Sequence, residues 1–248
     1  MKNTLLTLLL ILPICLFAQM NRDNNVDVLN LGMEYGFHTP GGDLKDRFGG
    51  GSMLGGKLEY LLKNNWAFSV DGSFFFGRVV KEDPIDALRD SDSLFIGNNF
   101  SQANIFLRQR GFYVGASVGK LFPVLKKNKR SGIKVDFGIG LFQHKIRIQD
   151  DPESFVPILS GDYKKGYDRL SNGLALKQFI GYQHLAKNRL INCYAGFEFT
   201  EAFTQSRRSY NFDTRSADES KRVDILTGFK VGWILPFYIG ETAEEIYY

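Results

Sequence analysis

The stretch IKVDFGIGL, residues 133–141, carries the pattern on which the fold of this chain depends. Its odd-numbered positions are all large and apolar, whereas its even-numbered positions are Lys134, Asp136 and two glycines. A period of two residues indicates a β-strand, because successive side chains of a strand point to opposite faces. The stretch therefore predicts a strand with one apolar face and one face of charge and glycine.

The same alternation recurs in seven further segments of the chain. They span residues 28–37, 52–62, 66–76, 112–122, 174–182, 191–199 and 223–235. A strand tilted as in a barrel crosses a bilayer in about 9–11 residues, so each segment is long enough to span. We predict an all-β fold: a closed, antiparallel, transmembrane β-barrel of about eight strands.

The connections between these segments alternate in length. Short joins lie at 63–65, 123–131 and 186–189, and long polar ones at 38–51, 79–110, 149–172 and 203–222. Short periplasmic turns and long extracellular loops are typical of outer-membrane barrels. We expect some extra strand or helix within 79–110. We also expect strand pairing to stop at Pro236, because proline cannot donate a hydrogen bond to a sheet.

The first residues predict a secretory signal peptide. Lys2 precedes an apolar run from Thr4 to Ala18, and cleavage is expected after Ala18. Cys15 does not predict lipidation, because Ile14 stands where a lipobox has a small residue. The expected organisation is a signal peptide at 1–18, an outer-membrane barrel at 19–237 and a short periplasmic tail at 238–248.

The polar face of the predicted strands carries charges that a barrel would bring into one lumen. These residues are Glu34, Lys57, Glu59, Asp71, Lys134, Asp136, Lys177, Glu198 and Lys230. Buried charges persist only when they are paired, and four cations against five anions come close to balance. The alternative is the solvated face of a soluble periplasmic sheet, which the alternation alone does not exclude.

These strands and their long-loop, short-turn rhythm resemble the small outer-membrane β-barrels of the outer-membrane-protein-A and PorT-like type. The resemblance is architectural and extends over nearly the whole chain after the signal peptide. It implies an integral protein of the bacterial outer membrane, in contact with its lipids. It implies no particular activity, because such families are defined by strand pattern rather than by a chemical motif.

No constellation in the sequence predicts catalysis or a bound cofactor. The three histidines, His38, His144 and His184, are expected to lie apart, so no metal site is predicted. His38, Asp43 and Ser52 flank the first long loop but match no catalytic motif. The net charge of +4 is small and scattered, which gives no indication of nucleic-acid binding.

Two loop segments interleave aromatic residues with cations and are candidates for partner binding. They contribute Tyr163, Lys164, Lys165, Tyr167, Arg169, Arg207, Arg208 and Tyr210. Arginine and tyrosine often anchor interfaces, so these loops could bind another envelope protein or lipopolysaccharide phosphates. The C-terminal tail is a second candidate for contact with envelope proteins. The alternative is that the loops are simply polar.

The sequence thus favours a non-enzymatic structural or interaction component of the cell envelope, such as an accessory subunit of a secretion or assembly complex. A narrow, porin-like passive or gated channel is the first alternative. Eight strands enclose an interior that side chains just fill, which disfavours conduction. An enzyme that modifies outer-leaflet lipid is the second alternative.

Overall fold

The computed structural model describes residues 26–90, 94–98, 100–125, 128–149, 156–186 and 191–239. The predicted signal peptide at 1–18 lies outside these residues. Most of the predicted tail, residues 240–248, also lies outside them.

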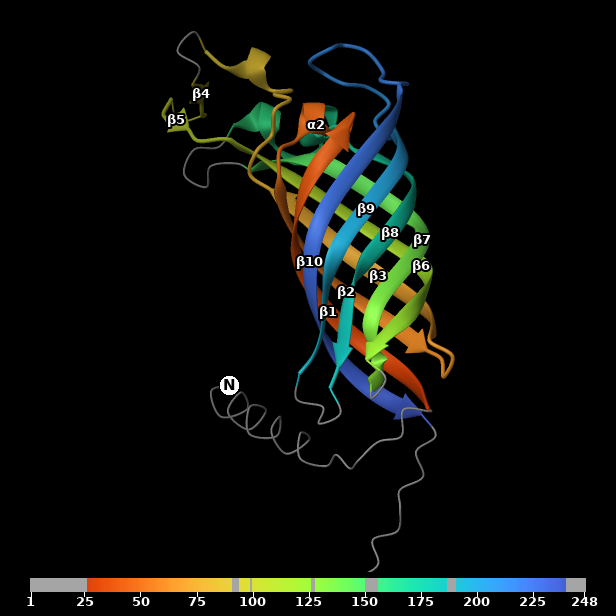
Figure 1. The fold of residues 1–248 in the computed structure, drawn as a ribbon. Coiled ribbons are helices and arrows are strands. Elements are labelled where there is room, and N and C mark those ends of the chain that lie inside the picture. The colour runs from red at the N-terminus through yellow and green to blue at the C-terminus, as the bar shows by residue number, and fades with distance from the viewer. Residues whose placement is uncertain are drawn as a thin grey trace, which may run out of the picture.

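Eight antiparallel strands form a closed barrel (Figure 1). They are β1 (Asp27–Gly42), β2 (Gly51–Leu61), β3 (Trp66–Gly77), β6 (Phe106–Leu125), β7 (Asn128–Gln149), β8 (Ser171–Leu185), β9 (Asn192–Ser206) and β10 (Lys221–Ile239). Each strand pairs with its neighbour in the chain, and β1 also pairs with β10, so that Asp27 lies opposite Ile239 and the ring has no free edge. The predicted fold class is confirmed.

The connections sort to the two ends of this barrel (Figure 1). The four long ones meet at what we call the loop end, and the short ones lie at the turn end. The long connections contain the helix α2 (Leu44–Arg47), the 3-10 helices η2 (Asp86–Leu88), η3 (Pro157–Leu159) and η4 (Gly161–Gly166), and the hairpin strands β4 (Phe95–Ile96) and β5 (Gln102–Ala103). The extra structure expected within 79–110 is therefore present as η2, β4 and β5.

The prediction that pairing ends at Pro236 is wrong. Pro236 lies opposite Asn30, and β10 continues beside β1 as far as Ile239. The register of β10 with β9 ends earlier, at Trp233. Among the described residues, the part of β10 beyond Trp233 is paired only with β1, and a strand with one unpaired side can accommodate a proline.

The inside of the barrel has three layers. An apolar layer fills the turn end, with Val28, Leu61, Ala67, Leu121, Phe179, Leu185, Tyr194 and Ile234. A second apolar layer fills the loop end, with Leu44, Phe48, Met53, Phe75, Tyr113, Phe142, Ile146, Ala175, Ala202 and Leu226. Leu44 and Phe48 belong to α2 and its C-terminal cap, so this short helix closes the loop end of the barrel. The charged residues lie between the two layers.

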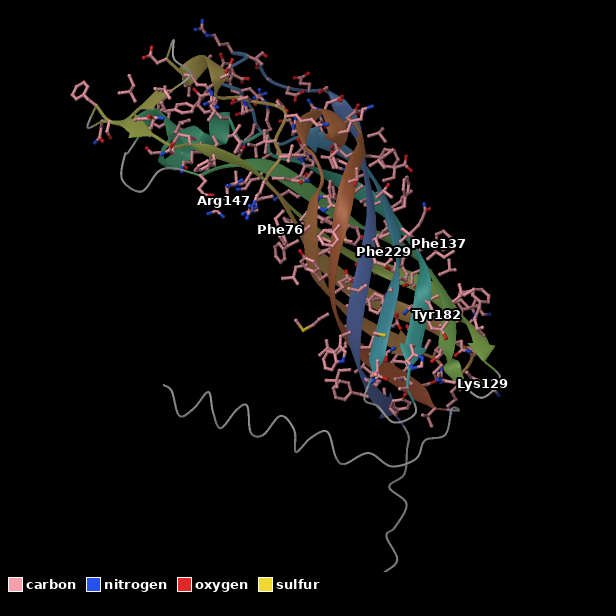
Figure 2. The ribbon with its side chains drawn as sticks, turned by 60° about the vertical axis from the view of Figure 1, so that its left-hand side comes forward. Phe76, Lys129, Phe137, Arg147, Tyr182 and Phe229 are labelled. Carbon is pink, nitrogen blue, oxygen red and sulfur yellow. The ribbon has the colours of Figure 1, made fainter. Side chains whose placement is uncertain are left out.

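The outside of the barrel is apolar. Phe74, Phe137 and Leu141 point outward and are 67%, 59% and 63% exposed. Figure 2 shows Phe137, Tyr182 and Phe229 on this outer surface. No helix among the described residues is long and apolar enough to cross a membrane.

Candidate functional site: the charged lumen and the loop cap

Four of the lumen charges form one chain of ion pairs. Nζ of Lys57 lies 2.6 Å from Oδ2 of Asp136 and 3.1 Å from Oε2 of Glu59. Lys134 also pairs with Glu59, and it donates to Oε1 of Gln183 at 2.9 Å. The order is Asp136, Lys57, Glu59, Lys134. With two cations and two anions, this series of ion pairs is neutral.

The other five lumen charges form a second chain. Lys177 pairs with Asp71, and its Nζ lies 3.9 Å from Oε2 of Glu198. Lys230 pairs with Glu198, and its Nζ lies 3.0 Å from Oε2 of Glu34. Two cations here face three anions, so the second chain carries one excess negative charge. The structure thus brings all nine predicted lumen residues into two ion-pair chains.

Neutral side chains complete these chains. Tyr194 donates to Glu34, as does Ser73 at 3.0 Å, and Ser117 donates to Asp71 at 3.1 Å. Tyr194 is not among the predicted lumen residues, although it shares the parity of Glu198 on β9. The same parity rule, applied to polar aromatic residues as well as to charges, would have found it.

The lumen contains little free space. Two cavities lie among the charged residues, and each measures only about 10 Å³. A cavity of that size holds about one water molecule. Apolar layers lie above and below the charged residues. In the described part of the barrel, these residues are therefore surrounded by closely packed side chains and do not line an open aqueous path.

The histidines do not converge. His144 Nε2 lies 2.9 Å from Oδ2 of Asp224 inside the barrel, and His38 lies inside against Oε1 of Gln109 at 3.3 Å. His184 lies near the turn end, with Nδ1 3.4 Å from the Ser131 hydroxyl. Within the described ranges, no three His, Cys, Asp or Glu side chains are grouped to hold a metal ion.

The residues around the first long loop do not form a catalytic triad. His38 is buried against Gln109, whereas Asp43 is exposed and its Oδ2 accepts a hydrogen bond from the backbone N–H of Val223 at 2.7 Å. A triad requires the acid to orient the histidine. The two side chains serve separate structural contacts instead.

The four long loops are tied together by ion pairs into a structure that we call the loop cap. Arg47 of the first loop lies 2.6 Å from Glu82 of the second. Glu82 lies 2.5 Å from Arg169 of the third loop, and Nη1 of Arg169 lies 2.9 Å from Asp213 of the fourth. Each of the four loops is thus connected to the next through a guanidinium group.

The electrostatics of the loop cap favour these pairs. Burial opposes ionisation of Glu82, but the guanidinium groups of Arg47 and Arg169 lower its pKa below the ordinary value. Burial likewise opposes ionisation of Asp213, and Arg169 together with backbone N–H groups lowers the pKa of that carboxyl. Both carboxylates are therefore charged at neutral pH.

An apolar cluster supports the ion pairs of the loop cap. Its members come from the second and third loops and from β7: Ile85, Phe95, Ala103, Ile148, Val156, Leu159 and Tyr167. Because the loops share this core, the cap is a small folded unit continuous with the barrel.

The predicted partner-binding residues divide into two groups. Tyr163, Lys165, Arg207 and Tyr210 are exposed on the loop cap. Lys164 is half-buried, and Arg208 makes two hydrogen bonds to Asp168 at 2.8 and 2.6 Å.

Tyr167 and Arg169 are buried, and their prediction as exposed partner contacts is corrected. Tyr167 packs in the apolar cluster, and Arg169 joins three loops. The sequence segment around them looks like an ordinary polar loop, so their inward direction depends on the other loops.

Exposed apolar residues add to the surface of the loop cap. Phe100 is 93% exposed, Ile96 55% and Ile158 46%. They were not predicted, because they stand in loops without a regular alternation. They lie on the same end of the molecule as Tyr163 and Tyr210.

A closed ring of eight strands with an apolar exterior and a charged, closely packed interior defines a transmembrane β-barrel. A soluble sheet would bury the apolar face and expose the charges, so the soluble alternative is excluded. In strand number and in the alternation of long and short connections, the chain resembles the small outer-membrane barrels, as the sequence predicted.

No protein-family model and no curated protein matches the sequence. Among solved structures, the chain is similar to the attachment invasion locus protein Ail of Yersinia pestis, with 10% identity over 86% of this chain and 99% of that one, and a TM-score of 0.47. It is also similar to Neisserial surface protein A, with 13% identity over 83% and 96% and a TM-score of 0.44. The N-terminal β-barrel domain of Pseudomonas aeruginosa OprF gives 10% identity over 83% and 97%, and a TM-score of 0.37.

Proposed function

We propose that this chain is a non-conducting, non-enzymatic barrel that carries an ordered binding platform on the outer face of the outer membrane. The observation that carries the proposal is the loop cap, in which four loops are joined through Arg47, Glu82, Arg169 and Asp213. A loop held in one conformation loses less entropy on binding than a free loop does.

The exposed side chains of the loop cap suit a protein partner. Tyr163 and Tyr210 are 61% and 45% exposed, and Arg207, three residues before Tyr210 in the sequence, is exposed as well. Tyrosine and arginine are enriched among the residues that dominate binding energy at interfaces. The partner is another envelope protein, in keeping with an accessory role in a secretion or assembly complex.

Affinity purification in mild detergent tests this role. The variant Tyr163→Ala/Arg207→Ala/Tyr210→Ala should lose a partner that co-purifies with the wild-type protein, and the purified pair should reproduce the difference in affinity. Tyr182→Ala is the matched control, because Tyr182 is 41% exposed but lies on the barrel wall. Equal recovery of the partner with both variants would contradict the proposal.

The channel alternative makes a different prediction. Two apolar layers and cavities of about 10 Å³ oppose the passage of hydrated ions. We expect no regular conductance steps when the purified protein is inserted into a planar bilayer. Reproducible steps of uniform size would favour the channel, and altered lipid A in a deletion strain would favour the lipid-modifying enzyme.

A further inference from the structure

Four cations interrupt the outward apolar face where β6 and β7 approach the loop end. Arg108 lies opposite Arg147, and Arg110 lies opposite Lys145. Like charges directly opposite each other destabilise an antiparallel pair. In the described part of the chain, no acidic side chain forms an ion pair with any of the four. We call these residues the basic cluster.

The basic cluster begins at the margin of the apolar belt. Along β7, the outward residues Phe137, Ile139 and Leu141 are all more than half exposed, and the outward positions that follow are Gln143, Lys145 and Arg147. On β6, the outward residue Phe112 is followed toward the loop end by Arg110 and Arg108. Figure 2 shows Arg147 on the outside of the barrel, closer to the loop end than Phe137. The cluster therefore lies where lipid headgroups meet the barrel.

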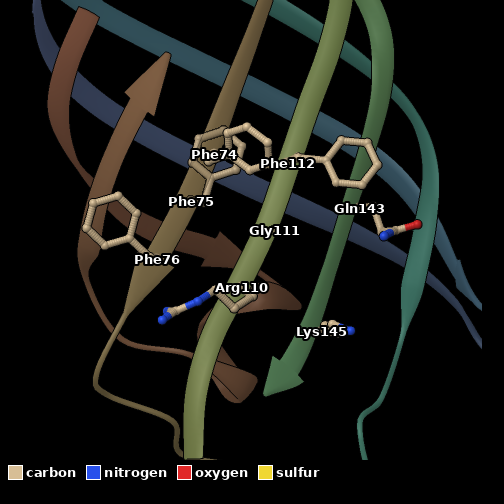
Figure 3. A pocket seen from close by; sticks show the side chains of 8 residues that line it. All are labelled: Phe74, Phe75, Phe76, Arg110, Gly111, Phe112, Gln143 and Lys145. Carbon is tan, nitrogen blue, oxygen red and sulfur yellow. The ribbon is translucent and has the colours of Figure 1, made fainter. Parts of the chain in front are cut away.

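An open groove of about 400 Å³ adjoins the cluster on the outer wall. Phe74, Phe76 and Phe112 contribute aromatic rings to its lining, and Arg110 and Lys145 contribute the charged part (Figure 3). Aromatic rings on one side and cations on the other match a molecule with a hydrocarbon chain and an anionic head.

We propose that this groove binds a phosphorylated glycolipid of the lipid A class, with an acyl chain against the phenylalanines and its two phosphates on the basic cluster. Guanidinium groups bind phosphate oxygens in a bidentate manner. A phosphomonoester carries about −1.5 to −2 charges, so two of them balance four cations, whereas a phospholipid with a single negative charge does not. The choice of an outer-leaflet lipid rests on the proposed outward orientation of the loop end.

The full chain in phosphatidylcholine nanodiscs allows a direct test. Addition of bisphosphorylated lipid A should raise the Tm of the wild-type protein, and native mass spectrometry should detect the retained lipid. Arg110→Gln/Arg147→Gln should weaken lipid A retention about tenfold or more, the equivalent of losing roughly 1.4 kcal/mol of binding free energy. Without lipid A the double variant should be at least as stable as wild type, because the repulsion between opposite cations is reduced.

The matched control is Lys120→Gln/Lys129→Gln, which removes two cations near the turn end and should leave lipid A retention unchanged. Three results would overturn the proposal: equal stabilisation by phosphatidylglycerol at the same charge, equal stabilisation by dephosphorylated lipid A, or an equal loss of retention in the control. The nanodisc presents lipid to both ends of the barrel, so binding is measured independently of cellular orientation. The experiment can therefore show that the lipid site is absent even if the proposed orientation of the loop end is correct, and the reverse.

Discussion

Lys177 illustrates, at the scale of a single residue, how the lumen depends on paired charge. Its ammonium group is buried between Asp71 and Glu198 and lies 4.2 Å from the centre of the Tyr113 ring. Removal of one partner from a buried pair leaves an uncompensated charge, which is destabilising by about 3–5 kcal/mol. We expect Lys177→Met to lower the free energy of unfolding by that amount, measured by urea titration in lipid vesicles.

A paired substitution separates charge from packing at this position. Lys177→Met/Asp71→Leu removes both members and should recover part of the loss, because no carboxylate is then left without its cation. The exposed Lys129 serves as the control, and Lys129→Met should change stability by less than about 0.5 kcal/mol. If the double variant is no more stable than the single one, the ion pair is not the source of the effect.

Phe137 tests the outward face at the same scale. It lies at the centre of the outward apolar face of residues 133–141 and is 59% exposed. An arginine on the lipid face of a barrel costs about 2–4 kcal/mol near the bilayer midplane, and we expect Phe137→Arg to lose that much stability on refolding into vesicles. Tyr163 is 61% exposed but lies on the loop cap, so Tyr163→Arg should change stability by less than about 0.5 kcal/mol. Equal losses in the two variants would contradict the membrane position of the apolar belt.

Among the structural elements, the loop cap is expected to become more mobile at low pH. The pKa of Glu82 in the folded cap is below its ordinary value of 4.5, and that of Asp213 is below 3.8. A carboxyl with a lowered pKa stabilises the fold fully above its ordinary pKa, and this contribution is lost as the pH falls through the folded-state value. We expect a spin label on Tyr163→Cys, in a Cys193→Ser background, to be equally immobile at pH 7 and pH 5 and to gain mobility only below about pH 4.

Arg169 provides the internal comparison for this experiment. It contacts both Glu82 and Asp213, so Arg169→Met removes a cation that helps to lower both pKa values and leaves only Arg47 beside Glu82. The label should then be more mobile already at pH 7, and its mobility should change less on acidification. A pH response that is the same in wild type and Arg169→Met would exclude these ion pairs as its cause.

At the scale of the whole molecule, the two ends of the barrel should be on opposite sides of the outer membrane. Tyr163 is exposed in a long loop at the loop end. Lys129 is exposed, and Figure 2 shows it near the turn end. In a Cys193→Ser background, we expect a membrane-impermeant maleimide to label Tyr163→Cys on intact cells and Lys129→Cys only after the outer membrane is opened. The reverse pattern would overturn the proposed orientation.

The closed ring itself has a measurable consequence. Every barrel strand has a neighbour on both sides. The sheet therefore has no free edge at which unfolding in detergent can begin. We expect unheated samples to migrate differently from boiled ones on a denaturing gel. Identical migration, together with extraction by carbonate, would contradict an integral membrane barrel.

The strands and the two faces of the barrel follow from the order of the amino acids alone. Alternation is a local property of an extended backbone, so the parity of IKVDFGIGL already places Lys134 and Asp136 on the face opposite Phe137. The same rule applied to all eight strands identified the nine residues that meet in the lumen. It also indicated which end of the barrel carries the long loops.

Which of these residues contact each other depends on how the strands are arranged in the barrel. Lys57 pairs with Asp136 although 79 positions separate them, because the tilt and stagger of a closed ring set which inward residues face each other across the lumen. Tyr167 and Arg169 turn inward because the second and fourth loops supply their partners. The basic cluster and its groove arise from the register of β3, β6 and β7, a relation between strands that alternation within any one of them does not contain.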